Sequence, residues 1–128
     1  MGKLICIVED NVPIRKLFCT LLKKSGYETV DFGDGSSAIN WINTGKPDLM
    51  IVDILLPDMN GTDIMKHART LPHGNSFPIM ASTGFAQASD RDKYLGLGFD
   101  FYISKPINAT TFVQDIKQVM DDFAASKK

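Results

Sequence analysis

Residues 49–53 read LMIVD, and this short stretch decides the fold. Four apolar residues run without interruption and end on the carboxylate of Asp53. A continuous apolar run of this kind is typical of a central strand in a parallel sheet, because helices cover both faces of such a strand. The stretch therefore predicts a buried strand that presents an acidic side chain at its carboxyl end.

Similar apolar runs recur at a fairly regular interval along the chain. They cover residues 4–8, 27–32, 79–82 and 101–104. Residues 4–8 are nearly continuous in their apolar character, which favours a second central strand. Residues 27–32 alternate between polar and apolar, which suits a strand at the edge of the sheet.

Helical patterns separate these runs. The first begins with Asn11 as an N-cap and Pro13 in its first turn, and Gly26 ends it. Further helical stripes occur at residues 36–42, 64–71, 86–97 and 109–123. The stripe at residues 86–97 is the most polar of them. Strands that alternate with helices predict an α/β fold with a parallel sheet and right-handed crossovers.

Length and composition restrict the function as well as the fold. The chain has 128 residues, and its 14 Lys and Arg against 15 Asp and Glu give a net charge of −1. We therefore expect one domain and no nucleic-acid binding, which usually requires a basic excess. We also expect no membrane attachment, because no apolar run reaches the length of a bilayer span. Cys6 and Cys19 lie in apolar stretches, which indicates reduced core thiols and a reducing compartment.

The polar residues at the strand ends form a chemically coherent set. Ligand sites in open α/β sheets lie beyond the carboxyl ends of the strands. Four strands deliver Glu9-Asp10, Asp53, Ser82-Thr83 and Ser104-Lys105-Pro106 to this edge. Three carboxylates repel one another unless a cation is present, and oxygen ligands favour Mg²⁺ among the common metals. With an ammonium and a hydroxyl, Mg²⁺ stabilises a transferring phosphoryl group, and a carboxylate can accept it covalently.

Four motifs in this arrangement resemble those of response-regulator receiver domains of the chemotaxis-regulator type. They are VEDN at 8–11 followed by Arg15, DILLPDMNG at 53–61, PIMASTG at 78–84 and GFDFYISKPI at 98–107. The resemblance covers the whole chain in order. It implies a flavodoxin-like, doubly wound sheet of five parallel strands in the order 2-1-3-4-5 with five helices. It also implies that residues 1–128 form a single, stand-alone receiver domain without an output domain.

The resemblance implies a role for each residue of the acidic set. Asp53 would take a phosphoryl group from a phosphohistidine, so the chain would be a phosphoacceptor in two-component signalling rather than a classical enzyme. Asp10 and Asp53 would bind Mg²⁺ directly, Leu55 through its backbone carbonyl and Glu9 through a metal-bound water. Glu9 stands where Asp is commoner in the family, so its longer side chain leaves direct ligation as an alternative.

The remaining motif residues would convert phosphorylation into a signal. Lys105 would pair with a phosphoryl oxygen, and with Asp53 before phosphorylation. Thr83 would move towards another phosphoryl oxygen, and Tyr102 would fill the space that Thr83 leaves. The helix after the fourth strand, the fifth strand and the last helix would form the surface that partners recognise. The bond before Pro106 would be cis, as is typical of the family.

Four residues outside this set carry further expectations. Leu55 and Phe85 occupy positions that tune the access of hydrolytic water in the family, so two apolar side chains there predict slow self-dephosphorylation. Asp58 is expected to face solvent, although it lies in the loop after Asp53. Arg15 is expected to be a surface charge in the first turn of its helix.

The implied partners are a sensor histidine kinase or a histidine phosphotransfer protein, and a downstream protein target. The chain would be a monomer or weak dimer in the cytoplasm. A phosphorelay shuttle and a receiver that signals without phosphorylation are the alternatives within the family. A phosphatase of the haloacid dehalogenase type would need an acid at Leu55. A flavodoxin-like cofactor binder would need a hydroxyl- and glycine-rich loop where Glu9 and Asp10 stand.

Overall fold

Five parallel strands form one sheet in the order β2-β1-β3-β4-β5. In this computed structural model, which describes residues 2–84 and 88–126, the strands are β1 (Leu4–Val8), β2 (Glu28–Phe32), β3 (Leu49–Asp53), β4 (Ile79–Thr83) and β5 (Phe101–Ser104). The helices are α1 (Val12–Lys24), α2 (Gly35–Ile42), α3 (Gly61–Thr70), α4 (Ala88–Leu97) and α5 (Phe112–Ser126). The predicted doubly wound α/β fold and its strand order are confirmed.

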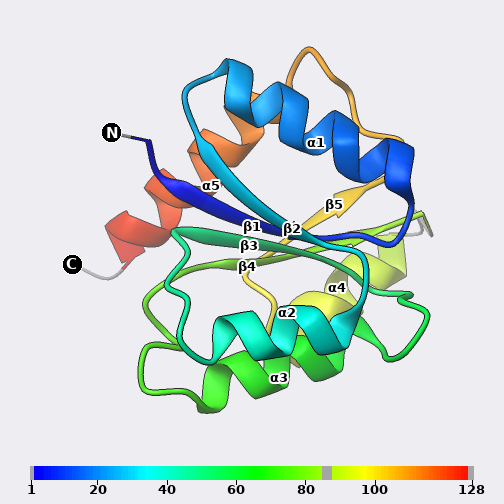
Figure 1. Cartoon of the computed structure of the whole chain (residues 1–128), viewed down its shortest axis with the longest axis vertical. Helices are drawn as coiled ribbons and strands as arrows, with labels where there is room; N and C mark the ends of the chain where they lie inside the picture. Colours follow the sequence, from blue (N-terminus) through cyan, green and yellow to red (C-terminus); the bar gives the residue numbers. More distant parts are fainter. Residues whose placement is uncertain (1, 85–87, 127–128) are drawn as a thin grey trace.

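The helices cover the sheet in two layers. Helices α1 and α5 lie on one face, and α2, α3 and α4 lie on the other (Figure 1). In the first layer the rings of Phe18 and Phe112 stack with their centroids 4.9 Å apart. Strand β3 supplies Ile51 to this cluster and Val52 to the opposite one, and all of its residues are buried. This confirms the central strand predicted from residues 49–53. Both cysteines are buried free thiols, as the sequence also indicated.

Side chains of the Asn and Asp type begin three of the helices. Asn11 accepts a hydrogen bond from Ile14 N at 3.0 Å, and Asp34 accepts one from Ser37 N at 2.7 Å. Asn60 does the same for the first turn of α3. Each of these caps occupies one of the amide groups that a helix leaves without a partner at its start. The chain therefore enters a helix after only three residues beyond β1 and two beyond β2, whereas a loop of seven residues separates β3 from α3.

The ends of several elements differ from the predicted bounds by a few residues. Strand β4 extends one residue beyond the predicted range 79–82, and both Asp53 and Thr83 are held inside the sheet. Helix α5 begins at Phe112 rather than Ala109, because the side chain of Asn108 accepts a hydrogen bond from Thr110 N at 2.9 Å and holds a turn. Residues 88–97 of the predicted fourth helix are confirmed, and residues 86–87 lie outside the described part of the chain.

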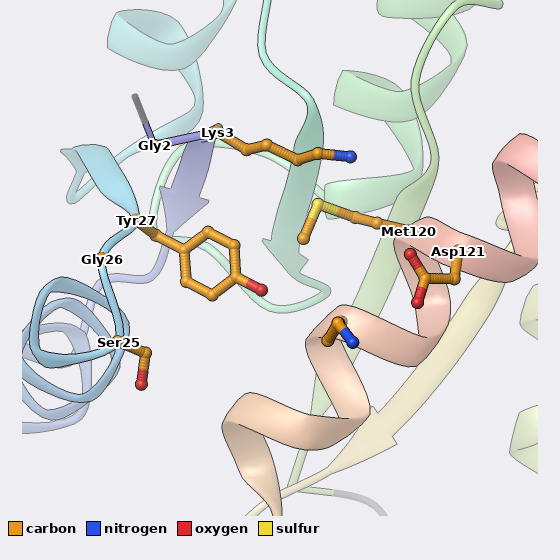
Figure 2. A pocket seen from close by; sticks show the side chains of 8 residues that line it. Gly2, Lys3, Ser25, Gly26, Tyr27, Met120 and Asp121 are labelled. Atoms are coloured by element: carbon orange, nitrogen blue, oxygen red, sulfur yellow. The ribbon is translucent and has the colours of Figure 1, made fainter.

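A hollow of about 270 Å³ lies at the amino ends of β1 and β2 (Figure 2). Lys3 and Tyr27 line it from the residues before these strands, and Met120 and Asp121 line it from α5. Burial raises the pKa of the Tyr27 hydroxyl, and the charge of Asp121 raises it further. Functional groups in this class of fold gather at the carboxyl edge. The hollow is therefore separate from the polar residues that the sequence singles out.

Arg69 ties α3 to the amino ends of β4 and β5. Its Nη1 donates hydrogen bonds to the carbonyl oxygens of Gly74 at 2.7 Å and Phe77 at 2.9 Å, and its Nη2 pairs with Asp100. Asp100 also accepts a hydrogen bond from Ile79 N at 2.8 Å. One guanidinium therefore holds the loop between α3 and β4 against the start of β5.

Replacing Arg69 by Met keeps the length of the side chain and removes every donor. Because partly buried acceptors and the Asp100 charge then lose their partner, we expect Arg69→Met to lower the free energy of unfolding by about 2–4 kcal/mol. Urea denaturation measures the change. Lys66→Met, at an exposed position of the same helix, is the control and should stay within about 0.5 kcal/mol of the original protein. Equal losses in the two variants would contradict the anchoring role.

Candidate functional site

Glu9, Asp53 and Ser82 form one row of side chains across the carboxyl edge of the sheet. The register pairs Val8 with Val52, and Asp53 with Ser82, so the residue after β1 aligns with the end of β3. Since successive residues of a strand point to opposite faces, all three side chains face the layer of α1 and α5. Glu9 is 1% exposed, Asp53 5% and Ser82 1%. Three polar side chains are thus placed side by side in a buried environment.

Three carboxylates meet at one end of this row. Glu9, Asp10 and Asp53 each offer an oxygen, and these oxygens lie within 4.8 Å of one another. Glu9 and Asp53 are buried, whereas Asp10 is exposed and leaves the cluster open on that side. Carboxylate oxygens at this spacing suit a hard divalent cation that keeps some of its water ligands. The donor set therefore fits the Mg²⁺ that the sequence predicts.

Lys105 supplies positive charge to the cluster from the end of β5. Its Nζ donates a hydrogen bond to Glu9 Oε1 at 2.7 Å and lies 3.4 Å from Asp53 Oδ1. The expected ion pair with Asp53 is present, but Glu9 is the nearer partner because its longer side chain reaches further across the sheet. Glu9 Oε2 also accepts a hydrogen bond from Asn11 N at 3.2 Å, which holds the carboxylate in place. The bond between Lys105 and Pro106 is cis, as expected.

The environment of Asp53 disfavours its ionised form. The pKa of Asp53 is raised to about 7. Burial contributes most to the rise, the hydrogen bond and charge of Glu9 and the hydrogen bond of Asp10 add to it, and Lys105 opposes it. The single ammonium, shared between two carboxylates, does not balance the cluster. In the metal-free protein Asp53 therefore binds a proton below about pH 7 rather than below about pH 4.

This raised pKa gives the stability of the metal-free protein a definite pH dependence. The folded state binds the Asp53 proton more tightly than the unfolded chain, so the free energy of unfolding should fall as the pH rises from about 4 to about 7. Asp53→Asn removes this effect and should stabilise the metal-free protein by about 1–3 kcal/mol at about pH 8, with the gain vanishing at about pH 4. Urea denaturation with a chelator at several pH values measures the difference, with exposed Asp63→Asn as the control. A constant difference across this range would contradict the raised pKa.

The loop after β3 is held close to Asp53 by its backbone. Ile54 N donates a hydrogen bond to Ser82 O at 3.1 Å, and Gly61 N donates one to Ile54 O at 2.8 Å. Leu55 N lies 3.3 Å from Asp53 Oδ1 as a hydrogen-bond donor. A Cβ atom on Gly61 would lie 2.3 Å from the backbone oxygen of Asp53, so this close approach requires glycine. The backbone carbonyl of Leu55 as a metal ligand stays a prediction.

A methyl group on Gly61 should therefore disturb both the fold and the site. Because the obstructing atom belongs to the backbone, Gly61→Ala must displace α3 or Asp53, and we expect it to lower the free energy of unfolding by about 2 kcal/mol or more. Gly96→Ala in α4 is the control, since its Cβ meets no atom within 4 Å. It should be neutral or stabilising by up to about 1 kcal/mol, because alanine favours helices. The urea midpoints of the two variants decide the matter, and a neutral Gly61→Ala would refute the close approach.

Asp58 binds the start of α2 rather than only facing solvent. Its carboxylate accepts hydrogen bonds from Gly35 N at 2.8 Å, Ser36 N at 2.9 Å and Ser36 Oγ at 2.9 Å. These bonds, that of Gly35 above all, lower the pKa of Asp58. The side chain is exposed as expected, but its role as a second cap on α2 was missed. Partners 22 and 23 residues away leave no signal in the local sequence.

Arg15 is also more than the surface charge that its position in the first turn of α1 indicated. Its Nη1 donates a hydrogen bond to Glu9 O at 2.9 Å, and its Nε lies 3.0 Å from Asp31 Oδ2. A Cβ on Gly33 would lie 2.6 Å from Nη1, so the guanidinium sits against the backbone after β2. The expectation is corrected: Arg15 fixes the backbone of Glu9 between β1 and β2.

Thr83 and Tyr102 face the opposite side of the sheet from the carboxylates. Tyr102 packs against the cluster under α2, α3 and α4, and the register places Thr83 on the same side. Thr83 is 1% exposed, and its carbonyl oxygen accepts a hydrogen bond from Lys105 N at 2.8 Å. The ring of Tyr102 stacks on Tyr94 of α4 with centroids 6.2 Å apart and planes 11° apart. The two residues are thus neighbours of α4, and their roles in switching stay predictions.

The sequence predicts that Leu55 and Phe85 slow the loss of a phosphoryl group. Leu55 is 55% exposed beside the carboxylate cluster. Phe85 lies outside the described residues. Slow self-dephosphorylation therefore stays a prediction from the sequence.

The fold and the site together define a class of protein: a doubly wound α/β domain with a cation-binding acidic cluster and an ammonium at its carboxyl edge. Residues 5–117 match the model of one such family, the response regulator receiver domain. The chain belongs to this family of two-component signalling proteins. It is therefore a phosphoacceptor regulator rather than a classical enzyme, it works with a histidine kinase, and its cofactor is Mg²⁺.

Similar proteins agree with this assignment. The polar-differentiation response regulator DivK of Brucella anthropi is 36% identical over 122 residues, which cover 95% of this chain and 99% of that protein. The crystal structure of a CheY-like receiver domain protein from Methanospirillum hungatei has 28% identity and a TM-score of 0.87, covering 98% of this chain and 99% of that one. The receiver domain of a sensor histidine kinase from Pseudomonas aeruginosa has 26% identity and a TM-score of 0.85, covering 94% and 99%, and it holds a magnesium ion in its active-site cleft. In residues 2–84 and 88–126, no helix has the length and apolar character to span a membrane.

Proposed function

We propose that Asp53 is the residue of this response regulator that accepts the phosphoryl group. The observation that carries the proposal is the position of Asp53 as the last residue of β3, between two other carboxylates and 3.4 Å from the Lys105 ammonium. Glu9 is pinned by Lys105 and Asn11 N, and Asp10 is exposed beyond β1. Asp53 is therefore the buried carboxylate that Lys105 holds less closely, which leaves it available to accept the phosphoryl group.

The proposed reaction is an in-line transfer from a phosphohistidine. A carboxylate oxygen of Asp53 forms a bond to phosphorus while the bond between phosphorus and the imidazole nitrogen breaks. The electron pair of the broken bond returns to the imidazole, and the product is an aspartyl phosphate. Mg²⁺, when bound, would neutralise charge on the carboxylates and the phosphoryl oxygens.

The side chains around Asp53 would then hold the phosphoryl group. Asp10 and Asp53 would bind Mg²⁺ directly, Glu9 through a water, and Leu55 through its backbone carbonyl. Lys105 would exchange its contact with Glu9 for a phosphoryl oxygen on Asp53, since its Nζ already lies 3.4 Å from Asp53 Oδ1. Charge-assisted hydrogen bonds of this kind are about twice as strong as neutral ones.

The proposed output is a change on the surface of α4, β5 and α5. Thr83 would move towards the phosphoryl group, and Tyr102 would follow into the space that it leaves. Two contacts support this route: Lys105 N is bonded to Thr83 O, and the Tyr102 ring stacks on Tyr94 of α4. A segment that shifts easily is needed for such a switch, and the weak apolar pattern of α4 agrees with it.

The proposed function also specifies domain organisation, oligomeric state and partners. Residues 1–128 would act as one receiver domain that signals by contact with a downstream protein, as a monomer or weak dimer in the cytoplasm. A histidine phosphotransfer protein would be an alternative donor to the kinase. No role with nucleic acid or membranes is proposed, because a chain with a net charge of −1 lacks the excess of basic residues that either would attract.

Intact-mass measurement after incubation with acetyl phosphate tests the phosphoacceptor. With Mg²⁺ present, we expect the original protein to gain one phosphoryl group and Asp53→Asn to gain none. Asp63→Asn, an exposed carboxylate in the first turn of α3, is the control and should be phosphorylated normally. A phosphoryl group on Asp53→Asn would exclude Asp53 as the acceptor.

A further inference from the structure

Ser82 carries a buried hydroxyl that nothing in the site yet explains. The residue is 1% exposed, and within the described part of the chain its Oγ has no hydrogen-bond partner. It lies on β4 beside Asp53 of β3, with its side chain on the same face of the sheet. A buried polar group without a partner costs free energy, and a state of the protein in which this hydroxyl gains a partner would recover that cost.

The path of the Lys105 side chain across the sheet makes its ammonium the candidate partner for the Ser82 hydroxyl. Lys105 follows β5, whereas its nearest contact, Glu9, follows β1. Strands β3 and β4 lie between these two in the sheet. The side chain of Lys105 therefore crosses the carboxyl end of β4, where Ser82 is, and that of β3, where Asp53 is.

Phosphorylation of Asp53 would draw the ammonium back along this course. In the present state Nζ lies nearer to Glu9, at 2.7 Å, than to Asp53, at 3.4 Å. Strand β4 lies beside β3 on the side away from β1, so a shift of Nζ from Glu9 towards a group on β3 also brings Nζ closer to β4. A Lys ammonium has three hydrogens to donate. One would go to the phosphoryl group, and another would then be free for an acceptor on β4.

We propose that Ser82 is a positioning residue for Lys105 in the phosphorylated state. Its Oγ accepts a hydrogen bond from Nζ once the ammonium has left Glu9, and this bond holds the ammonium against the phosphoryl oxygen. The inference rests on the proposed function of Asp53 and Lys105, and it adds Ser82 of β4 to the residues that hold the phosphoryl group in place. In the metal-free protein the same hydroxyl has no partner among the described residues. The hydroxyl should therefore stabilise the phosphorylated state and destabilise the metal-free state.

A matched pair of variants separates the hydroxyl from the shape of the side chain. Ser82→Thr keeps the hydroxyl, and Ser82→Val has the same shape without it, so any effect of the added methyl group is common to both. The probe is beryllofluoride with Mg²⁺, a mimic of the phosphoryl group, and its affinity is read from the shift in melting temperature with concentration. We expect Ser82→Val to bind about ten-fold more weakly than Ser82→Thr, because one bond to a charged group is lost. Equal affinities of the two variants would overturn the proposal.

Two further measurements distinguish a role through Lys105 from a purely structural role of Ser82. They are the melting temperatures of the metal-free variants and the affinities for the probe in a Lys105→Ala background. Without the probe, Ser82→Val should melt above Ser82→Thr, because it removes the unpartnered hydroxyl. In a Lys105→Ala background the two variants should bind the probe equally, since the hydroxyl acts through the ammonium. A ten-fold difference that persists without Lys105 would assign Ser82 to a direct contact and overturn its role through Lys105. If the original protein binds no beryllofluoride and Asp53 accepts no phosphoryl group, it is the proposed function that fails.

Discussion

Repulsion among the carboxylates of Glu9, Asp10 and Asp53 is the constraint on which the rest of the site depends. The sheet brings their oxygens within 4.8 Å of one another, and two of the three are buried. One ammonium, that of Lys105, is shared between Glu9 and Asp53 and does not balance the charge. The cluster is therefore stable only with a proton or a cation, and this makes its affinity for Mg²⁺ and its readiness to accept a phosphoryl group two results of the same arrangement.

The surrounding structure serves to hold these charges together. Arg15 fixes the backbone at Glu9, and Gly61 lets α3 approach the backbone of Asp53 closely. Asp58 binds the loop after β3 to the start of α2. None of these residues belongs to the acidic cluster, yet each limits how far a carboxylate can move away from its neighbours. The strand ends and the capped loops thus prevent the carboxylates from moving apart to relieve their repulsion.

Asp53 lies on one face of the sheet, and Thr83 and Tyr102 lie on the other. Asp53, Ser82 and Lys105 act on the side of α1 and α5, whereas Thr83 and Tyr102 face α4. The two faces are joined by short links, since Ser82 and Thr83 are consecutive and Lys105 N is bonded to Thr83 O. A displacement of Lys105 would therefore reach the far side of β4 through these two links, without a long chain of contacts.

Much of this could be predicted from the sequence, and the reasons for success and failure are physical. Apolar runs such as residues 49–53 report burial on both faces, and the polar residues after them must gather at the carboxyl edge of a parallel sheet. The preference of Lys105 for Glu9 could not be foreseen, because it depends on a difference of less than 1 Å in reach. The contacts of Asp58 with α2 and of Arg15 with Asp31 join residues far apart in the sequence, and neither hydrophobic periodicity nor local composition indicates such pairs. The unpartnered Ser82 hydroxyl becomes visible only when every buried polar atom has been placed.

The number of protons released when Mg²⁺ binds tests this account most directly. It is obtained by isothermal titration calorimetry in buffers of different ionisation enthalpy, between about pH 6 and about pH 9. Because the pKa of Asp53 is raised to about 7, binding should release nearly one proton at the acid end and none at the alkaline end. Asp53→Asn should release none throughout this range. Binding to the original protein without proton release at any of these pH values would show that the carboxylates are already ionised together, and it would contradict the central role of their repulsion.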